Sequence, residues 1–225
     1  MCGRFSLAVS QAVLQQQLPF LDLSESPEPS YNIAPKQQAC VVVYTGQPRL
    51  VSMVWGLVPH WSNDGRNDGL LINARQEGIA SKPSFRIPFR QRRCLVPADS
   101  FYEWRNEGGQ KIPYRIQRKD GRLLLFAGIW DLWDGAAGPL HTFSIITTEA
   151  NAEMSGLHNR MPVILSNESD QLHWLRSDKL DDLLLLVRFR EDDILDMYRV
   201  SVSVNSPVHN YPGLHDPVPE PPRLF

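Results

Sequence analysis

The sequence predicts an α+β fold in which a largely antiparallel, barrel-like β-sheet is flanked by helices. Segments rich in β-branched and aromatic residues outnumber the helical patterns, and most of them are joined by short turns. The 225 residues, 42% of them hydrophobic and 21% charged, suffice for a folded domain with its own core. We therefore expect a single domain over residues 1–225, with a proline-rich C-terminal tail at residues 211–225.

The first third of the chain predicts a helix, a loop and a β-hairpin, in that order. Apolar residues recur at helical spacing within residues 8–18, whereas three prolines within residues 24–35 favour a loop. The β-rich runs 39–44 and 50–55 flank a short turn that contains Gly and Pro, which is typical of a hairpin. A polar loop follows at residues 62–69.

The rest of the chain continues the pattern of short strands and adds helices towards the C-terminus. Strands are predicted at residues 94–97, 101–104, 114–117, 123–129, 142–148 and 198–204. Helices are predicted at residues 151–157, 168–175 and 179–186. The five prolines that follow residue 210 predict an extended, loosely attached tail.

The cysteine count and the hydropathy exclude several classes of protein. Three cysteines without a Cys-x-x-Cys pair argue against both a disulfide framework and a structural zinc site. The longest apolar run, at residues 183–187, is far shorter than the roughly 18 residues that span a bilayer. The N-terminus has no signal-peptide pattern. We therefore expect a cytoplasmic protein that makes no membrane contact.

The charged residues are unevenly distributed, although the formal net charge is only −2. Residues 75–94 contain six basic residues and one acidic residue. Such a segment is compatible with a basic groove that binds nucleic acid, and equally with a solvated helix or loop that carries scattered arginines. Charge alone does not decide between these two interpretations.

Cys2 has the most informative position of any residue. A small residue at position 2 permits removal of the initiator Met1, which leaves an α-amine and a thiol on one residue. In model peptides these groups have pKa values of about 7.7–8.0 and 8.5, so both are partly nucleophilic near neutral pH. The amine can form an imine with an aldehyde, and the thiol can close it to a thiazolidine. The alternative is a frayed terminus; Cys40 and Cys94 lie in apolar runs and are interpreted as core residues.

Short motifs are spread along the whole chain. They are Cys-Gly-Arg-Phe at residues 2–5, Tyr-Asn-Ile-Ala-Pro at 31–35, Trp-Gly-Leu-Val-Pro at 55–59, Asn-Ala-Arg-Gln-Glu at 73–77, Phe-Tyr-Glu-Trp at 101–104 and His-Asn-Arg-Met-Pro at 158–162. In this order and spacing the chain resembles the SOS-response-associated peptidase (SRAP) family, the abasic-site shield proteins, over residues 2 to about 210. The resemblance implies the SRAP fold. It also implies a substrate, an abasic site in single-stranded DNA, whose ring-opened sugar exposes an aldehyde.

The resemblance further implies a role for each of four residues. Cys2 would become covalently attached to the abasic sugar, and Asn73 would orient the Cys2 amine or the sugar hydroxyl. Glu103 would shuttle protons during imine formation and ring closure, and His158 would act on the sugar ring oxygen and assist strand incision. Taken alone, these residues have plainer interpretations. Asn73 would be a turn residue, Glu103 an outward-facing strand residue and His158 a histidine bonded to backbone at a helix end.

Phosphate and base contacts are expected from arginines and tryptophans. Arg75 and Arg160 resemble phosphate ligands of the family, and Arg4 is a weaker candidate. The residues expected either to stack on bases or to fill the core are Trp55, Trp61 and Trp104. The family implies no metal and no cofactor. We expect a monomer that, in a bacterium, associates with the nucleoid during repair.

Other functions are compatible with parts of the sequence. An N-terminal nucleophile amidohydrolase also begins Cys-Gly, but Arg4 and Phe5 replace its usual small apolar residues. A thiol peptidase would use Cys2, His158 and Glu103, with self-processing of its own N-terminus as the obvious cut. A non-catalytic module would bind single-stranded DNA through the basic segment and the tryptophans. AP-lyase and self-processing peptidase activities are also compatible with the shield chemistry itself.

Overall fold

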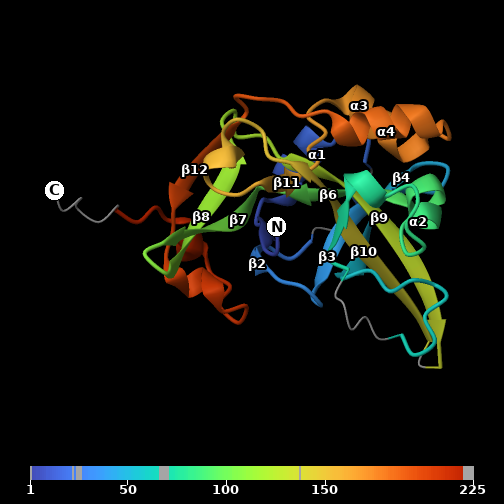
Figure 1. The fold of residues 1–225 in the computed structure, drawn as a ribbon, viewed down its shortest axis with the longest axis horizontal. Helices are drawn as coiled ribbons and strands as arrows, with labels where there is room; N and C mark the ends of the chain where they lie inside the picture. Colours follow the sequence, from blue (N-terminus) through green and yellow to red (C-terminus); the bar gives the residue numbers. More distant parts are fainter. Residues whose placement is uncertain (1, 22, 24–26, 66–70, 137, 220–225) are drawn as a thin grey trace.

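Two β-sheets form the centre of the structure, and the helices lie around them (Figure 1). The computed structural model describes residues 2–21, 23, 27–65, 71–136 and 138–219. Its strands are β1 (Phe5–Leu7), β2 (Ser30–Ile33), β3 (Gln38–Tyr44), β4 (Pro48–Trp55), β5 (Asn73–Arg75), β6 (Arg93–Ala98), β7 (Ser100–Glu107), β8 (Gln110–Arg118), β9 (Leu124–Gly135), β10 (Gly138–Glu149), β11 (Arg160–Pro162) and β12 (Leu195–Arg199). Its α-helices are α1 (Gln11–Gln17), α2 (Arg86–Gln91), α3 (Glu168–Arg176) and α4 (Leu180–Arg188), and its 3₁₀ turns are η1 (Gln76–Gly78), η2 (Met154–Gly156), η3 (Val202–Asn205) and η4 (Pro212–His215).

Five strands of the larger sheet close into a barrel. β9 and β10 form a long hairpin in which Ile129 lies opposite Ser144, and β6 pairs with the other edge of β9. β3 connects β6 to β4, and β4 closes the ring by pairing in parallel with β10, where Val54 lies beside Thr142. The other pairs of the ring are antiparallel. The prediction of an α+β fold with a largely antiparallel, barrel-like sheet is therefore confirmed.

The second sheet holds the N-terminal strand in its interior. Its strand order is β12-β8-β7-β1-β2, and its pairs are antiparallel. Phe5 of β1 lies between Ile33 of β2 and Phe101 of β7, so the backbone next to Cys2 is held from both sides. Two short strands, β5 and β11, pair with β10 of the larger sheet.

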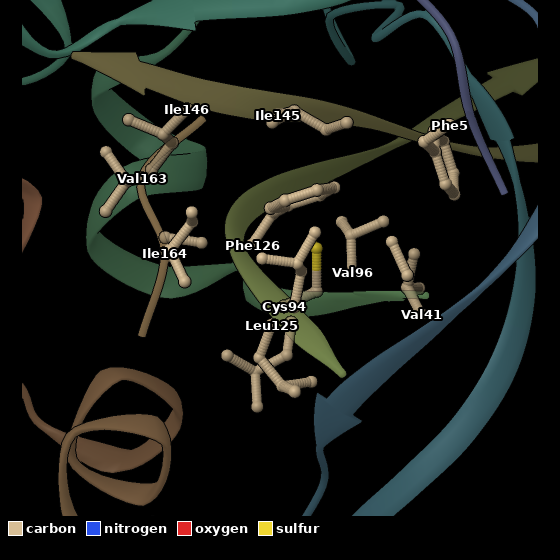
Figure 2. Packing of buried hydrophobic residues seen from close by; sticks show 14 of the residues in the cluster. Phe5, Val41, Cys94, Val96, Leu125, Phe126, Ile145, Ile146, Val163 and Ile164 are labelled. Atoms are coloured by element: carbon tan, nitrogen blue, oxygen red, sulfur yellow. The ribbon is translucent and has the colours of Figure 1, made fainter. Parts of the chain in front are cut away.

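One hydrophobic core fills the barrel and continues to the second sheet. Cys94 and Phe126 are fully buried in it, among the apolar side chains that Figure 2 shows. Phe5 reaches this core from the second sheet, and its ring centroid lies 5.0 Å from that of Trp55 and 6.4 Å from that of Phe126, both in edge-on contact. Because both sheets share the core, we propose that the chain folds as a single domain.

Most predicted strands and three predicted helices are confirmed. The confirmed elements correspond to α1, β3, β4, β6, β7, β8, β9, β10, α3 and α4. The prediction of a helix at residues 151–157 is wrong, because only the short turn η2 forms there. The side chain of Asn151 accepts a hydrogen bond from the N–H of Met154 at 3.0 Å and donates to the carbonyl of Glu191 at 2.9 Å. Such a side chain competes with helix formation and favours a single capped turn.

Several elements lie where none was predicted, among them β1, β2, β5, β11 and α2. Strand β2 forms within the loop predicted at residues 24–35, where it pairs with β1. The sequence does not predict α2, whose Pro88 stands in the first turn, where a missing N–H breaks no helical hydrogen bond. Residues 24–26, and residues 66–69 of the loop predicted at residues 62–69, lie outside the described part of the chain.

The C-terminal segment is folded onto the second sheet rather than extended. The strand expected at residues 198–204 ends at Arg199, and η3 follows it. Leu214 of η4 is fully buried in a small apolar cluster that includes Tyr102 of β7. The prediction of a loose tail is therefore wrong for the described part of the tail, and residues 220–225 lie outside it.

Stability is expected to fall between pH 7 and pH 5, because His215 is held as a neutral imidazole. Its ring lies 4.9 Å from that of Tyr31. Burial, with Arg115 as a second cause, lowers its pKa from 6.5 to about 4. The unfolded chain therefore takes up this proton at a higher pH than the folded protein, so acidification through this range favours unfolding. We expect the free energy of unfolding to drop by about 2 kcal/mol, measured by urea unfolding at the two pH values.

The control for this prediction is a second histidine. His215→Gln should remove the pH dependence, whereas His141→Gln, at an exposed position of β10, should leave it unchanged. Equal stability of the unsubstituted protein at pH 7 and pH 5 would contradict the prediction.

Candidate functional site

Cys2 is fully buried where the chain enters β1. Its Sγ lies 3.7 Å from the carbonyl oxygen of Arg4, to which the thiol donates a weak hydrogen bond. Burial, and secondly the negative charge of Glu103, raise the pKa of the thiol well above its usual range. The thiol is therefore protonated at neutral pH, and its sulfur is a weak nucleophile until a base removes the proton.

Asn73 is the first residue of β5 and contacts Cys2 directly. Its Nδ2 donates to the carbonyl oxygen of Cys2 at 2.8 Å. Pairing with β10 fixes the residue beside Ile145, and Trp55 Nε1 donates to the carbonyl of the preceding residue at 2.9 Å. Oδ1 of Asn73 is buried and accepts no hydrogen bond within the described residues. This oxygen can accept an N–H from a group bound next to Cys2.

Glu103 lies in β7 and is also buried, with 3% of the residue exposed. The sheet register places it opposite Tyr114 of β8. The N–H of the preceding residue, Tyr102, donates to the carbonyl oxygen of Arg4 at 2.9 Å, so β7 runs beside the start of the chain, and the charge of Glu103 acts on the Cys2 thiol. The plainer interpretation of Glu103 as an outward-facing strand residue is therefore wrong. A carboxylate in this position can take a proton from the thiol or return one.

His158 follows η2 and lies on a cavity of about 700 Å³. Its Nδ1 accepts a hydrogen bond from the backbone N–H of Arg160 at 2.9 Å, so the neutral imidazole carries its proton on Nε2. The cavity is also lined by Arg75, Glu149, Ser155, Asn159, Arg160 and Arg190. A histidine with a fixed tautomer on a polar cavity can donate a proton to a bound oxygen.

Strand β5 connects the cavity to the group formed by Cys2, Asn73 and Glu103. Asn73 and Arg75 flank a fully buried alanine, so their side chains point to the same face of the strand. Arg75 lines the cavity, whereas Cys2, Asn73 and Glu103 are not among the described lining residues. The structure thus brings Cys2, Asn73 and Glu103 together and places His158 on the neighbouring cavity.

Arg160 is held at the cavity by an ion pair. Its guanidinium binds both carboxylate oxygens of Glu77 and donates to the Thr147 carbonyl at 2.7 Å. The pairing lowers the pKa of Glu77. Only 11% of the Arg160 side chain is exposed, whereas Arg75 is an exposed residue. Arg75 is therefore the more accessible of the two predicted phosphate ligands.

The sequence matches one family model over most of its length. The model is described as SOS response associated peptidase (SRAP), and it covers residues 1–207. The chain belongs to the SRAP family. The match confirms the resemblance seen in the motifs.

Several known proteins are similar to this SRAP chain. The abasic site processing protein YoqW of Bacillus subtilis is 41% identical over 225 residues, which cover 95% of this chain and 98% of that one. The abasic site processing protein HMCES of Gallus gallus is 30% identical over 262 residues, which cover 97% of this chain and 78% of that one. A crystal structure from Bacteroides thetaiotaomicron has a TM-score of 0.84 at 27% identity and covers 96% of this chain and 100% of that chain. The SRAP chain therefore shares its fold with a solved structure.

Arg4 of the SRAP chain holds the C-terminal segment in place. Its guanidinium donates to Oδ1 of Asn32 at 2.7 Å and to the carbonyl oxygens of Val204 at 2.9 Å and Asn205 at 3.4 Å. Asn32, which is 1% exposed, also donates to the carbonyl oxygen of Ser206 at 3.0 Å. Arg4, the residue before β1, is therefore a clamp between the N-terminus and η3, and a phosphate would have to displace these oxygens to bind it.

The three tryptophans of the site prediction lie in different environments. Trp55 is fully buried against Phe5, so the expectation that it stacks on a base is wrong and its core interpretation holds. Trp104 is half-buried, and its Nε1 donates to Oδ1 of Asn205 at 2.7 Å. Trp61 is 54% exposed. Of these three rings, that of Trp61 is the most accessible to a base.

The basic segment at residues 75–94 is only partly on the surface. Arg93 is 8% exposed, and its Nε donates to the carbonyl of Trp174 at 2.6 Å. Arg92 forms an ion pair with the buried Asp131. Two of its arginines thus stabilise the fold, so the interpretation of the whole segment as a basic groove is wrong. Within the described lining, its first arginine is the member that reaches the cavity.

Sequence analysis missed four polar residues of the cavity, namely Glu149, Ser155, Asn159 and Arg190. Asn159 lies within the His-Asn-Arg-Met-Pro motif, so the motif was a signal that could have indicated it. Arg190 follows α4 in a segment without any motif, and only the fold brings it to the cavity.

Within the described part of the chain, no group of three His, Cys, Asp or Glu side chains is positioned to coordinate a metal ion. In the same part of the chain, no helix has the length and hydropathy needed to cross a membrane.

Proposed function

We propose that this SRAP chain processes abasic sites in single-stranded DNA by forming a covalent thiazolidine link between Cys2 and the abasic sugar. The observation that carries the proposal is the hydrogen bond from Asn73 to Cys2, next to a buried Oδ1 that has no partner within the described residues. The relatives YoqW and HMCES are named abasic site processing proteins, which supports the substrate. The covalent link would shield the lesion from other reactions.

The chemistry begins at the α-amine of Cys2, which is free once Met1 has been removed. The amine attacks the C1′ aldehyde of the ring-opened sugar, and loss of water gives an imine. The thiol then adds to the imine carbon. The S–C bond forms, the C=N double bond becomes a single bond, and the thiol proton moves to nitrogen. The product is a five-membered thiazolidine, and no oxidant or reductant takes part.

Asn73 and Glu103 are placed to assist these steps. Oδ1 of Asn73 accepts an N–H of the Cys2 amine and so directs the nitrogen lone pair towards the aldehyde. Glu103 removes the proton of the thiol, whose raised pKa prevents spontaneous ionisation, and supplies a proton to the departing hydroxyl. A neutral, buried thiol also reacts poorly with other electrophiles before the imine is present.

His158 acts on the sugar from the side of the cavity. Its Nε2–H donates to the ring oxygen and promotes opening to the aldehyde. The same group serves as the acid or base in an associated AP-lyase step, in which the imine promotes loss of the 3′ phosphate. Arg75 and Arg160 bind the phosphates on either side of the lesion.

A hydrolytic function has less support. A thiol peptidase or an N-terminal nucleophile amidohydrolase needs an activated sulfur. In hydrolysis the thiolate would have to attack first, and burial raises the pKa of the Cys2 thiol. In the proposed chemistry the amine attacks first, and the thiol reacts only with an imine that is already in place. Self-processing of the N-terminus is the one hydrolysis that we retain as a part of the proposal. A non-catalytic DNA-binding module would leave the contact between Asn73 and Cys2 without a role.

An oligonucleotide with a single abasic site tests the proposal. After incubation and denaturing electrophoresis, a heat-stable protein–DNA band is expected with the natural abasic site. The tetrahydrofuran analogue, which has no aldehyde, should give no band although it binds in a native gel. If neither oligonucleotide gives a band, the covalent mechanism is wrong. A non-catalytic module would retain both oligonucleotides in the native gel and crosslink neither.

The active protein is expected to lack Met1, because the imine requires a free amine on Cys2. Intact mass spectrometry of purified protein should give the mass of a chain that begins at Cys2. The same measurement on the crosslinked product should give that mass plus the oligonucleotide, less one water. Crosslinked product that retains Met1 would show that another nucleophile is used.

A further inference from the structure

The cavity beside His158 is lined by one arginine more than the two predicted phosphate ligands. Its described lining includes three arginines, Arg75, Arg160 and Arg190, and one carboxylate, Glu149, so positive charge is in excess there even though Glu77 pairs with Arg160. A volume of about 700 Å³ is within the usual range of small-ligand sites and can hold a nucleotide unit. The cavity is therefore suited to a phosphate-bearing ligand.

The arginines of the cavity differ in how firmly they are held. Arg160 is fixed by Glu77 and by the Thr147 carbonyl, and its side chain is only 11% exposed. Arg190 has a single described ion-pair partner, Glu149, whose Oε2 lies 2.7 Å from its NH1. The two side chains are 37% and 68% exposed, so water competes for both. Exposed ion pairs of this kind are weak and are readily exchanged.

The sheet explains why Glu149 lies at this end of the cavity. It is the last residue of β10 and lies opposite Arg160 of β11, while Thr147, two residues earlier, lies beside Arg75 of β5. Arg190 comes from the segment after α4 and reaches the same strand end. Arg75 and Arg190 therefore approach the cavity from different elements, with the carboxylate of Glu149 among them.

We propose that Arg190 is a phosphate-binding residue of this cavity and that Glu149 occupies its guanidinium until a DNA phosphate replaces the carboxylate. A phosphate bound between Arg75 and Arg190 accepts two charge-assisted contacts, and Glu149 then turns to solvent. The proposal rests on the proposed function in one respect, since it takes the phosphate to belong to single-stranded DNA. It predicts opposite effects of removing the arginine and removing the carboxylate.

The exchange can be tested by measuring the affinity for an undamaged single-stranded oligonucleotide. Fluorescence anisotropy gives this affinity at a series of salt concentrations. Arg190→Gln should weaken binding and reduce the slope of log affinity against log salt by about 0.7, the value for one phosphate contact in a single strand. Glu149→Gln should strengthen binding by about 1.5- to 5-fold, the range that corresponds to the loss of a weak competing ion pair. Arg188→Gln is the matched control, because Arg188 is also exposed and near in sequence but is not among the described residues of the cavity.

The double variant separates exchange from a general charge effect. If Glu149 acts by occupying Arg190, Glu149→Gln should have no effect on affinity in the Arg190→Gln background. A gain that persists there would overturn the exchange. An unchanged salt slope in Arg190→Gln, or a reduction equal to that in Arg188→Gln, would overturn the phosphate contact. Inorganic phosphate that binds as tightly as the oligonucleotide would overturn the assignment to DNA.

The crosslinking assay shows whether a negative result contradicts the phosphate site at Arg190 or the covalent chemistry of the proposed function. If the unsubstituted protein crosslinks the abasic oligonucleotide while Arg190→Gln leaves the salt slope unchanged, the phosphate contact is wrong and the covalent chemistry stands. If no crosslink forms but the salt slope changes as expected, the covalent chemistry is wrong and the phosphate site stands.

Discussion

Cys2→Ala should abolish the crosslink to an abasic oligonucleotide while leaving the affinity for undamaged single-stranded DNA within about twofold. Alanine keeps the α-amine, so an imine can still form, but no thiol is present to close it to a thiazolidine. Imines hydrolyse, and the product should not survive heating in a denaturing gel. The affinity should persist, because phosphate and stacking contacts do not use the sulfur.

Two further variants make this result specific. Cys40→Ala is the matched control, since Cys40 is a free cysteine of β3 that belongs to none of the motifs, and it should crosslink normally. Cys2→Ser should also fail to give a stable product, because an oxazolidine opens more readily than a thiazolidine. If Cys2→Ala lost the crosslink and the affinity together, Cys2 would have a structural role instead.

Glu103→Gln should slow crosslink formation by about 10²- to 10⁴-fold, the contribution typical of a positioned general acid or base. The amide has nearly the shape of the carboxylate but cannot accept the thiol proton. Single-turnover crosslinking with the abasic oligonucleotide in excess measures the rate. Glu107→Gln, in the same strand and half-buried, is the control and should leave the rate unchanged.

A second measurement separates proton transfer from simple loss of structure in Glu103→Gln. The charge of Glu103 raises the pKa of the Cys2 thiol, so its removal should lower that pKa and increase thiol alkylation at a given pH. Slower crosslinking with faster alkylation is the expected pair of results. A slower rate for both reactions would indicate that the site is distorted and that Glu103 is not the proton carrier.

The barrel could be predicted from the sequence because its signals are local. Each strand of the barrel contains a β-rich run, and the short connections from β3 to β4 and from β9 to β10 limit how consecutive strands can pair. The C-terminal segment could not be predicted in the same way. Its prolines favour an extended chain, but Leu214 gains burial against Tyr102, a residue more than a hundred positions earlier in the chain. Such tertiary contacts leave no periodic pattern in the sequence.

The site could be predicted only through the family resemblance. Contact between Asn73 and Cys2 depends on the pairing of β5 with β10 and of β1 with its neighbours, which no local pattern specifies. The arginines show the same limit. Arg75 and Arg93 belong to one basic segment, yet the first faces the cavity and the second donates to a backbone carbonyl of α3. Residue type alone cannot distinguish a phosphate ligand from an arginine that stabilises the fold.

The clamp made by Arg4 connects the N-terminal segment to η3, near the C-terminus. It can therefore form only after almost the whole chain has been synthesised. Arg4 leaves the ribosome first, and its partner Val204 follows 200 residues later. At about 5–20 residues per second, roughly 10–40 s pass between the two. Throughout that interval the N-terminus lacks its clamp and is open to an aminopeptidase that trims nascent chains. Under the proposed function, the N-terminus is most accessible to trimming during translation, before the last turns arrive, and self-processing is the route that remains for a chain that keeps Met1 after the clamp has formed.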